Sequence, residues 1–210
     1  MRLRIAAHRS QTLLHRSNRI RSVRTESCCC DDWGAMPHEI ASAITESEAM
    51  KIRQTDPSSP EAVTILEQSW RFLDAMFPPD QRFRLDMDSL RASNITFFMA
   101  TEGGMATGCA AFAQQGDDWG ELKSMFVASA ARGSGAAKGL LDAVELCARE
   151  KGCTTLRLES GTGLDVAHRF YEREGFHTIG PFGAYPDVPS SVFMEKNLAP
   201  DSGDGDATSR

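Results

Sequence analysis

The sequence predicts an α/β fold of the α+β kind, in which a central, mostly antiparallel mixed sheet is flanked by helices. Three observations indicate this fold class. Strand-like segments between residues 95 and 127 follow one another through short turns, as in an antiparallel meander. A strongly periodic helix then leads into a strand near residues 154–160, which makes one helical crossover. Two more strand-like segments follow the last helix, and such an order does not extend a doubly wound sheet.

The first half of the predicted domain begins with a short strand and a long helix. The helix starts with Pro60 in its first turn and runs to about Phe77, with apolar residues at steps of three and four, so one face is expected to pack. Pro78-Pro79 ends it. The other elements expected here are a strand at residues 50–54, a short helix near 86–92, and strands at 95–101 and 105–115 around the turn Gly103-Gly104.

The second half begins with a strand from Glu121 and continues through a glycine turn into a helix that ends at Lys151-Gly152. A cation and a glycine are favourable at a helix C-terminus. Leu156 and Leu158 alternate with polar residues in the next strand, so they are expected to point inward. A last helix at residues 164–174 and strands at 176–179 and 191–197 complete the domain.

Composition bounds the domain organisation. The chain has 210 residues, of which 41% are hydrophobic, enough for one domain with tails. Residues 50–199 are the predicted domain, between an extension of residues 1–49 and a polar tail of residues 200–210, both without regular structure. No apolar run approaches the ~18 residues of a membrane span, so no membrane association is expected. The net charge of −6 argues against nonspecific binding to nucleic acid.

The N-terminal extension is basic and permits three interpretations. Seven arginines and no acidic residue lie within residues 1–25. The segment is an unstructured or over-extended terminus, a targeting peptide, or an arm that binds anions. The first is favoured because the segment lacks a helical stripe and because Met36 and Met50 offer later starts.

The six cysteines indicate reduced thiols. They form no CxxC pair and no Cys/His cluster with zinc spacing, so no metal site is predicted. Nothing resembles a secretory signal, and a cytoplasmic location is expected.

Residues 121–139 carry the clearest chemical signal. An apolar strand is followed by small residues, by Gly133-Ser134-Gly135 and by the start of a helix. Glycines let the backbone approach a ligand closely, and the unpaired N–H groups of a first helical turn favour phosphate oxygens. The segment therefore predicts a site for a pyrophosphate-bearing cofactor.

Spacing separates three phosphate-binding motifs. A Walker loop is excluded because Lys138 lies between Ala137 and Gly139, without the required Gly-Lys-Ser or Gly-Lys-Thr ending. A dinucleotide fingerprint persists only in altered form, because five residues separate Val127 from Gly133. The third motif, [Q/R]xxGx[G/A], is matched by Arg132-Gly133-Ser134-Gly135-Ala136-Ala137.

This third motif is the acyl-CoA pyrophosphate loop of the GCN5-related N-acetyltransferases, the GNAT family. A second block, Tyr171-Glu172-Arg173-Glu174-Gly175-Phe176, matches the family's Y-E-x-x-G-F segment. Over roughly residues 50–198 the chain resembles this family. The resemblance implies the GNAT acyl-CoA N-acyltransferase fold, acetyl-CoA as co-substrate, and transfer of an acetyl group to a primary amine of a small molecule or of a peptide or protein.

The resemblance also implies the cofactor-binding residues. The strand before the glycine turn would hold the pantetheine arm and the acetyl carbonyl through its backbone, at Met125, Phe126 and Val127. The main chain of the motif would bind the pyrophosphate, at Arg132, Gly133, Ser134, Gly135, Ala136 and Ala137. One departure is Leu164, where the family often has an asparagine that contacts the cofactor arm.

Catalytic roles follow in the same way. Tyr171 stands where the family places its general acid, and we expect Phe170 to fill the core and leave the phenol free; the alternative is a tyrosine that only packs. Glu121 lies at the offset of the catalytic glutamate in one branch of the family, although it could also be a solvated residue at a strand entrance. Glu159 is the second candidate base or, alternatively, a group that binds the ammonium of the acceptor.

The acceptor is less well defined. The first helix, the Pro78-Pro79 region and the segment Pro181–Pro189 are expected to flank the acceptor cleft with a mixed set of side chains: Trp70, Arg82, Arg84, Phe182, Tyr185 and Asp187. Two other functions stay open at this point, a noncatalytic acetyl-CoA sensor and a nucleic-acid-binding protein that uses the basic extension. A homodimer through the final strands is also possible.

Overall fold

The computed structural model describes residues 49–198. The elements are β1 (Lys51–Gln54), α2 (Pro60–Met76), η1 (Pro79–Gln81), α3 (Met87–Leu90), β2 (Ile95–Glu102), β3 (Met105–Gln114), β4 (Trp119–Val127), η2 (Ser129–Ala131), α4 (Ala136–Glu150), β5 (Thr155–Gly161), α5 (Asp165–Arg173), β6 (His177–Ile179) and β7 (Ser191–Asn197). The predicted extension up to residue 48, with Cys28–Cys30, and the predicted tail lie outside the described residues.

The strands form one seven-stranded sheet with the order β1-β2-β3-β4-β5-β7-β6. Neighbouring strands are antiparallel, apart from β4 and β5, which run parallel and are connected through α4. The predicted mixed sheet with one helical crossover is confirmed.

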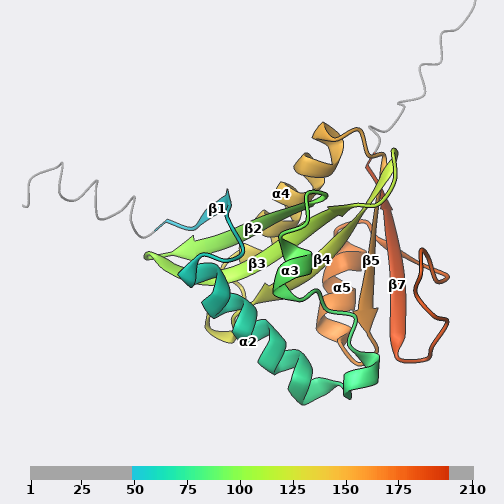
Figure 1. The fold of residues 1–210 in the computed structure, drawn as a ribbon, viewed down its shortest axis with the longest axis horizontal. Helices are drawn as coiled ribbons and strands as arrows, with labels where there is room; N and C mark the ends of the chain where they lie inside the picture. Colours follow the sequence, from blue (N-terminus) through green and yellow to red (C-terminus); the bar gives the residue numbers. More distant parts are fainter. Residues whose placement is uncertain (1–48, 199–210) are drawn as a thin grey trace, which may run out of the picture. The chain divides into compact units, whose positions relative to one another are not determined.

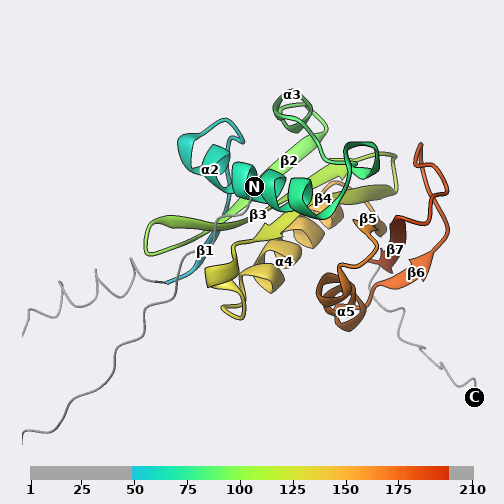
Figure 2. The ribbon, with the colours of Figure 1, turned by 90° about the horizontal axis from the view of Figure 1, so that it is seen from below.

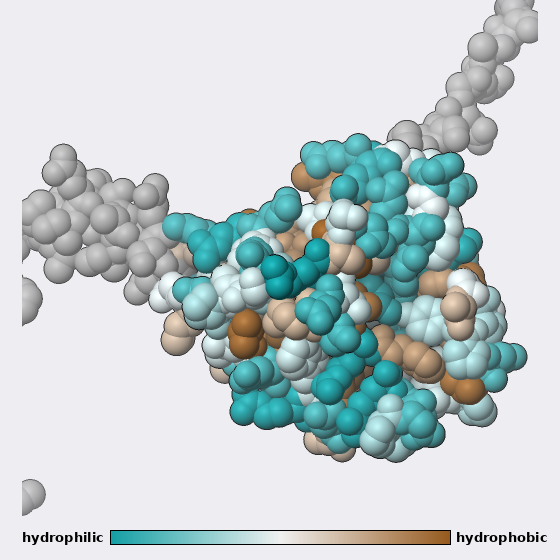
Figure 3. Space-filling view, viewed as in Figure 1, coloured by the Kyte–Doolittle hydropathy of each residue, from teal (hydrophilic) through white to brown (hydrophobic). Residues whose placement is uncertain are grey.

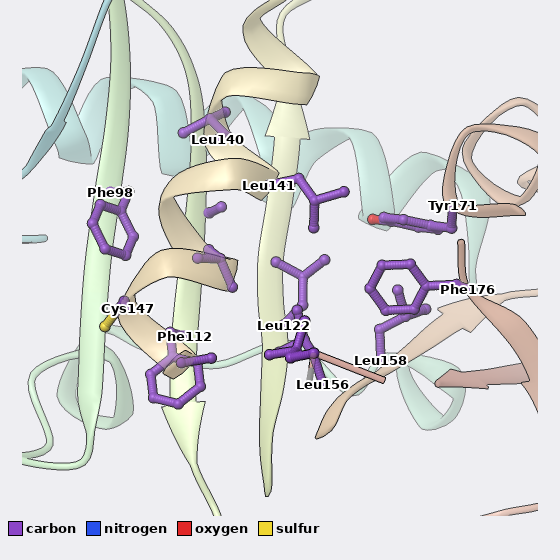
Figure 4. Packing of buried hydrophobic residues seen from close by; sticks show 14 of the residues in the cluster. Phe98, Phe112, Leu122, Leu140, Leu141, Cys147, Leu156, Leu158, Tyr171 and Phe176 are labelled. Carbon is purple, nitrogen blue, oxygen red and sulfur yellow. The ribbon is translucent and has the colours of Figure 1, made fainter. Parts of the chain in front are cut away.

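Helices cover both faces of the sheet. Figures 1 and 2 show α2 and α3 on one face and α4 and α5 on the other. One hydrophobic cluster lies under α4 and α5 and includes Leu141, Leu156 and Phe176 (Figure 4). A second lies under α2 and includes Ile65 and Met99. Because both faces are covered, β2 is buried at consecutive positions and shows no alternation.

Local signals fix the ends of α2 and the packing of the central strands. Ser59 caps α2 by accepting a hydrogen bond of 3.4 Å from the N–H of Ala62, and the helix ends before the extended Phe77. Gly120 is required in β4, since a Cβ there would lie 2.1 Å from Cε2 of the fully buried Phe112. The absence of a side chain at Gly120 therefore lets β3 and β4 pack in close contact.

The face that carries α2 is mostly hydrophilic, with small and separate hydrophobic areas (Figure 3). Among residues 49–198, no helix has both the length and the apolar character needed to cross a membrane.

Candidate active site

The predicted glycine turn leads into α4. Gly133 and Gly135 have φ angles of 86° and 91°, a left-handed backbone that glycine adopts at little cost. Gly135 is the N-cap of α4, without a side-chain hydrogen bond at the cap, and its carbonyl accepts from the N–H of Gly139 at 3.0 Å. The amides of the first turn precede that bond: the N–H of Ala136 donates to Ser134 Oγ at 3.4 Å, and the amides that follow it have no carbonyl partner within the helix and can face phosphate oxygens. The residues before α4 are exposed: Arg132, Gly133, Ser134 and Gly135.

β4 and β5 separate partway along their length. They pair from Trp119 opposite Thr155 to Leu122 opposite Leu158, and the rest of β4 pairs only with β3. Just past this point Ser124 has a φ angle of 51°, and the register of β4 with β3 shifts. A bulge of this kind bends a strand and redirects its peptide groups. The predicted cofactor-arm residues follow it directly: Met125, Phe126 and Val127.

A cavity of about 150 Å³ lies where the two strands separate. Its walls come from α2 and the segment after it on one side and from α5 on the other, so it connects the two faces of the sheet. The lining residues that bear on binding or catalysis are Arg82, Arg84, Lys123, Ser124, Met125, Phe126, Glu159, Ser160 and Tyr171.

Tyr171 projects from α5 toward this cavity. Figure 4 shows its ring beside Phe176 and its hydroxyl directed away from α5 toward Leu141. The side chain is only 6% exposed, and burial raises the pKa of the phenol above its ordinary value, so it stays protonated at neutral pH. Phe170 is partly buried and packs against the core cluster, as expected, but Tyr171 is the more buried of the two and shares the cavity-facing side of α5 with Ala167.

Glu159 lies on β5, on the opposite wall from Tyr171. Ser191 donates a hydrogen bond of 2.7 Å to its Oε1. Burial raises the pKa of Glu159; the Ser191 bond and the charge of Lys123 lower it, and the charge of Glu121 raises it. A carboxyl with a raised pKa in a cavity is suited to accept a proton.

Glu121 is placed differently. It is only 3% exposed and does not line the cavity. Its Oε1 accepts from the Tyr185 hydroxyl at 2.5 Å and from Lys123 Nζ at 3.2 Å, and its Oε2 accepts from Gln115 at 3.0 Å. Lys123 Nζ also contacts the Tyr185 hydroxyl. Glu121 therefore joins β4 to the segment between β6 and β7 and reaches the cavity only through Lys123.

The segment between β6 and β7 was expected to flank the acceptor cleft, but it does not line the cavity. Phe182 packs edge-on against Trp119 and Phe193, and Tyr185 packs against Phe83. The segment instead borders a neighbouring hollow through Pro186. Aromatic contacts with the sheet and the bond to Glu121 hold it there, so Phe182, Tyr185 and Asp187 do not reach the cavity wall.

Several predicted residues are thus brought together and others are not. Met125, Phe126, Glu159 and Tyr171 line one cavity, whereas Glu121, Val127 and the residues Arg132–Ala137 lie outside its lining. Sequence reasoning missed Lys123 and Ser124. Lys123 follows Glu121 in a polar-alternating strand and could have been noted, but no residue type signals the left-handed backbone of Ser124.

The sequence pattern of the Acetyltransferase (GNAT) family matches residues 60–176. Over 148 residues the chain is 35% identical to a protein named IAA acetyltransferase from Azospirillum brasilense, covering 70% of this chain and 97% of that protein. A Klebsiella pneumoniae protein assigned to the acyl-CoA N-acyltransferases has a similar crystal structure, with a TM-score of 0.62 and 29% identity over 72% of this chain and 99% of that one. PaiA N-acetyltransferase of Thermoplasma acidophilum, solved in complex with coenzyme A, has a TM-score of 0.58 and 19% identity over 71% and 99% of the two chains.

The fold is therefore that of the acyl-CoA N-acyltransferases, as predicted. Within that class, the chain belongs to the acetyltransferase (GNAT) family, and the predicted enzyme class of N-acetyltransferase is confirmed.

Proposed function

We propose that the protein transfers the acetyl group of acetyl-CoA to a primary amine of a small molecule or peptide, with Tyr171 as general acid and Glu159 as general base. The observation that carries the proposal is the cavity at the separation of β4 and β5. An acid, a basic carboxylate and the backbone after the β4 bulge meet there.

The residues around the start of α4 fit the cofactor. The exposed turn at Gly133 and Gly135 and the helix N-terminus that follows it support pyrophosphate binding at Arg132–Ala137. A Cβ at Gly133 would meet no atom within 4 Å, so the space beside the turn is open. Met125, Phe126 and Val127 would hold the pantetheine arm. The acetyl-CoA thioester supplies the acetyl group, and the coenzyme A complex of PaiA supports this choice.

The cavity residues account for the proton transfers. An ammonium must lose a proton before it can attack a carbonyl carbon, and Glu159 accepts that proton because burial raises its pKa. The amine then forms the C–N bond as the C–S bond breaks, and its nitrogen loses a second proton, which replaces the one that Tyr171 gives up. Tyr171 donates its proton to the departing thiolate, and burial keeps the phenol protonated until then. Glu121, the other predicted base, holds Lys123 and Tyr185.

A cytoplasmic location is consistent with the described cysteines, which are free thiols: Cys109, Cys147 and Cys153. The alternative function, a noncatalytic acetyl-CoA sensor, would use the same turn and the same strand backbone. It has no need of a buried phenol and a half-buried carboxylate in one cavity.

Tyr171→Phe tests the proposal, because it removes one hydroxyl and keeps a ring that packs. We expect kcat for thiol release from acetyl-CoA to fall by about 10²-fold or more, while the Kd of acetyl-CoA changes little. Phe170→Tyr is a control that adds a hydroxyl one position away. Unchanged kcat in Tyr171→Phe would contradict the acid role. Acetyl-CoA binding without turnover of any amine would favour the sensor.

A further inference from the structure

The cavity has a cationic wall formed by the segment that follows α2. Arg82 and Arg84 both line it. Both guanidinium groups contact the same oxygen, Oδ1 of Asp74, at 2.7 Å and 3.2 Å. Two cations therefore share one carboxylate, and one positive charge stays uncompensated on this wall.

The two arginines are held in different ways. Arg82 donates from Nε to the carbonyl of Phe77 at 2.7 Å and from a terminal nitrogen to the carbonyl of Asp74 at 3.3 Å, so it fixes the turn after α2. Arg84 lies over the ring of Trp70, 5.4 Å from its centroid. Within residues 49–198, no hydrogen bond is made by the Arg84 guanidinium beyond its ion pair with Asp74. Arg84 is 34% exposed, so its planar fork of donors is both positioned and accessible.

The opposite wall carries the opposite charge. Lys123 forms an ion pair with Glu121 at 3.2 Å and its charge also acts on Glu159, so two carboxylates share one cation and one negative charge is in surplus on the sheet. The cavity is thus polarised, with a surplus cation at the end of α2 and a surplus anion on the sheet. Such a field favours a ligand that carries both charges in the reverse order.

We propose that the acceptor is a small amine that also bears a carboxylate, with Arg84 binding the carboxylate and Glu159 facing the ammonium. This inference rests on the proposed acetyl transfer and specifies its substrate class. The cavity volume of about 150 Å³ suits an amino acid rather than a large amine. Arg84 would fix the orientation of the acceptor, so that its nitrogen is presented to the thioester.

The first experiment compares acids with their amides. Thiol release from acetyl-CoA is measured with a panel of α- and ω-amino acids, each beside its carboxamide, and with cadaverine as a diamine. We expect kcat/KM for the preferred acid to exceed that for its amide by about 10- to 100-fold. Equal values for acid and amide, or a preference for cadaverine, would overturn the inference.

The second experiment uses Arg84→Gln, with Arg71→Gln as a matched control. Arg71 lies on α2, is exposed and does not line the cavity. In Arg84→Gln we expect KM for the acid to rise by about 10-fold or more, with the amide changed by less than about threefold and Arg71→Gln like the wild type. An equal loss for acid and amide, or the same effect in Arg71→Gln, would overturn the inference.

A measurement of acceptor binding distinguishes a failure of this inference from a failure of the proposed function. The protein is saturated with CoA, and stabilisation by each acid and each amide is measured by thermal unfolding. Stabilisation by the acids alone, lost in Arg84→Gln, supports the carboxylate site even if no amine is acetylated. If neither the acids nor the amides stabilise the protein, and the enzyme does acetylate other amines, the carboxylate site is refuted. The proposed acetyl transfer is then unaffected.

Discussion

At the scale of single residues, Ser191 lowers the pKa of Glu159, the proposed base. Its hydroxyl donates to Glu159 and thereby lowers a pKa that burial raises. A general base works only when deprotonated, so activity falls as the pH falls through its pKa. Because the pKa of Glu159 is raised, this loss begins at a higher pH than for a solvated glutamate.

In Ser191→Ala, the fall in activity at low pH, which is the acid limb of the pH–rate profile, is expected to begin at a still higher pH. Loss of a hydrogen bond to the charged carboxylate favours the protonated form, so the limb of kcat/KM against pH shifts upward by about one pH unit. The measurement is a pH–rate profile between pH 5 and 9. Ser190→Ala removes a neighbouring hydroxyl that does not bond to Glu159 and serves as the control. A limb that stays in place would argue against Glu159 as the titrating base.

Glu121 shows how a neighbouring residue changes the role of a carboxylate. Gln115, Lys123 and Tyr185 all donate to it, and it lies outside the cavity lining. Burial and the charge of Glu121 raise the pKa of Tyr185 above its ordinary value, so the phenol stays protonated as the donor in this pair. This network fixes the segment between β6 and β7 against β4.

At the scale of elements, the glycine turn and α4 act as one unit. Gly133 and Gly152 stand at opposite ends of the segment that includes α4, with similar φ angles of 86° and 84°. A Cβ at either position would meet no atom within 4 Å, so substitution strains both backbones without a clash.

Gly133→Ala and Gly152→Ala are therefore a matched pair. Each is expected to lower the free energy of unfolding by about 1–2 kcal/mol, because alanine is strained in a left-handed backbone. Only Gly133→Ala should also weaken the binding of acetyl-CoA, raising its Kd by about 10-fold or more, since only that turn leads into the N-terminus of α4. Calorimetry with acetyl-CoA and denaturant unfolding give the two quantities. Equal Kd values in the two variants would contradict pyrophosphate binding at this turn.

The separation of β4 from β5 is the other element-scale feature. Parallel pairing stops at Leu122 and Leu158, and the bulge at Ser124 follows at once. Full pairing would close the gap that Tyr171 and Glu159 line from opposite faces of the sheet. The cavity therefore exists because two adjacent strands diverge.

At the scale of the whole molecule, the proposed cofactor should stabilise the fold. A ligand at ~100 times its Kd adds ~2.7 kcal/mol to the free energy of unfolding. For a folded body of this size, the rise in Tm is roughly 5 to 10 °C. Thermal unfolding of the full chain is measured with acetyl-CoA, NAD and ATP at matched concentrations. A shift with acetyl-CoA alone is expected; a shift with NAD alone would favour the dinucleotide motif.

The sequence by itself determined the order of elements, the family and the residues of the cofactor motif. Hydrophobic periodicity, the Pro60 start and the glycine turns are local signals, and each is written within a few adjacent residues. The six residues from Arg132 to Ala137 are contiguous, and the role that we propose for them uses one stretch of main chain, so a motif can indicate them before any tertiary contact is known.

Only the tertiary structure decided which charged groups face one another. Glu121 and Glu159 look equivalent in sequence, but Tyr185, more than sixty residues away, reaches Glu121. Arg84 and Glu159 face one cavity although two α-helices and three strands separate them in the chain. The pairing of charges and the raised pKa of a carboxyl depend on burial and on distances through space, and no local pattern in the chain encodes those distances.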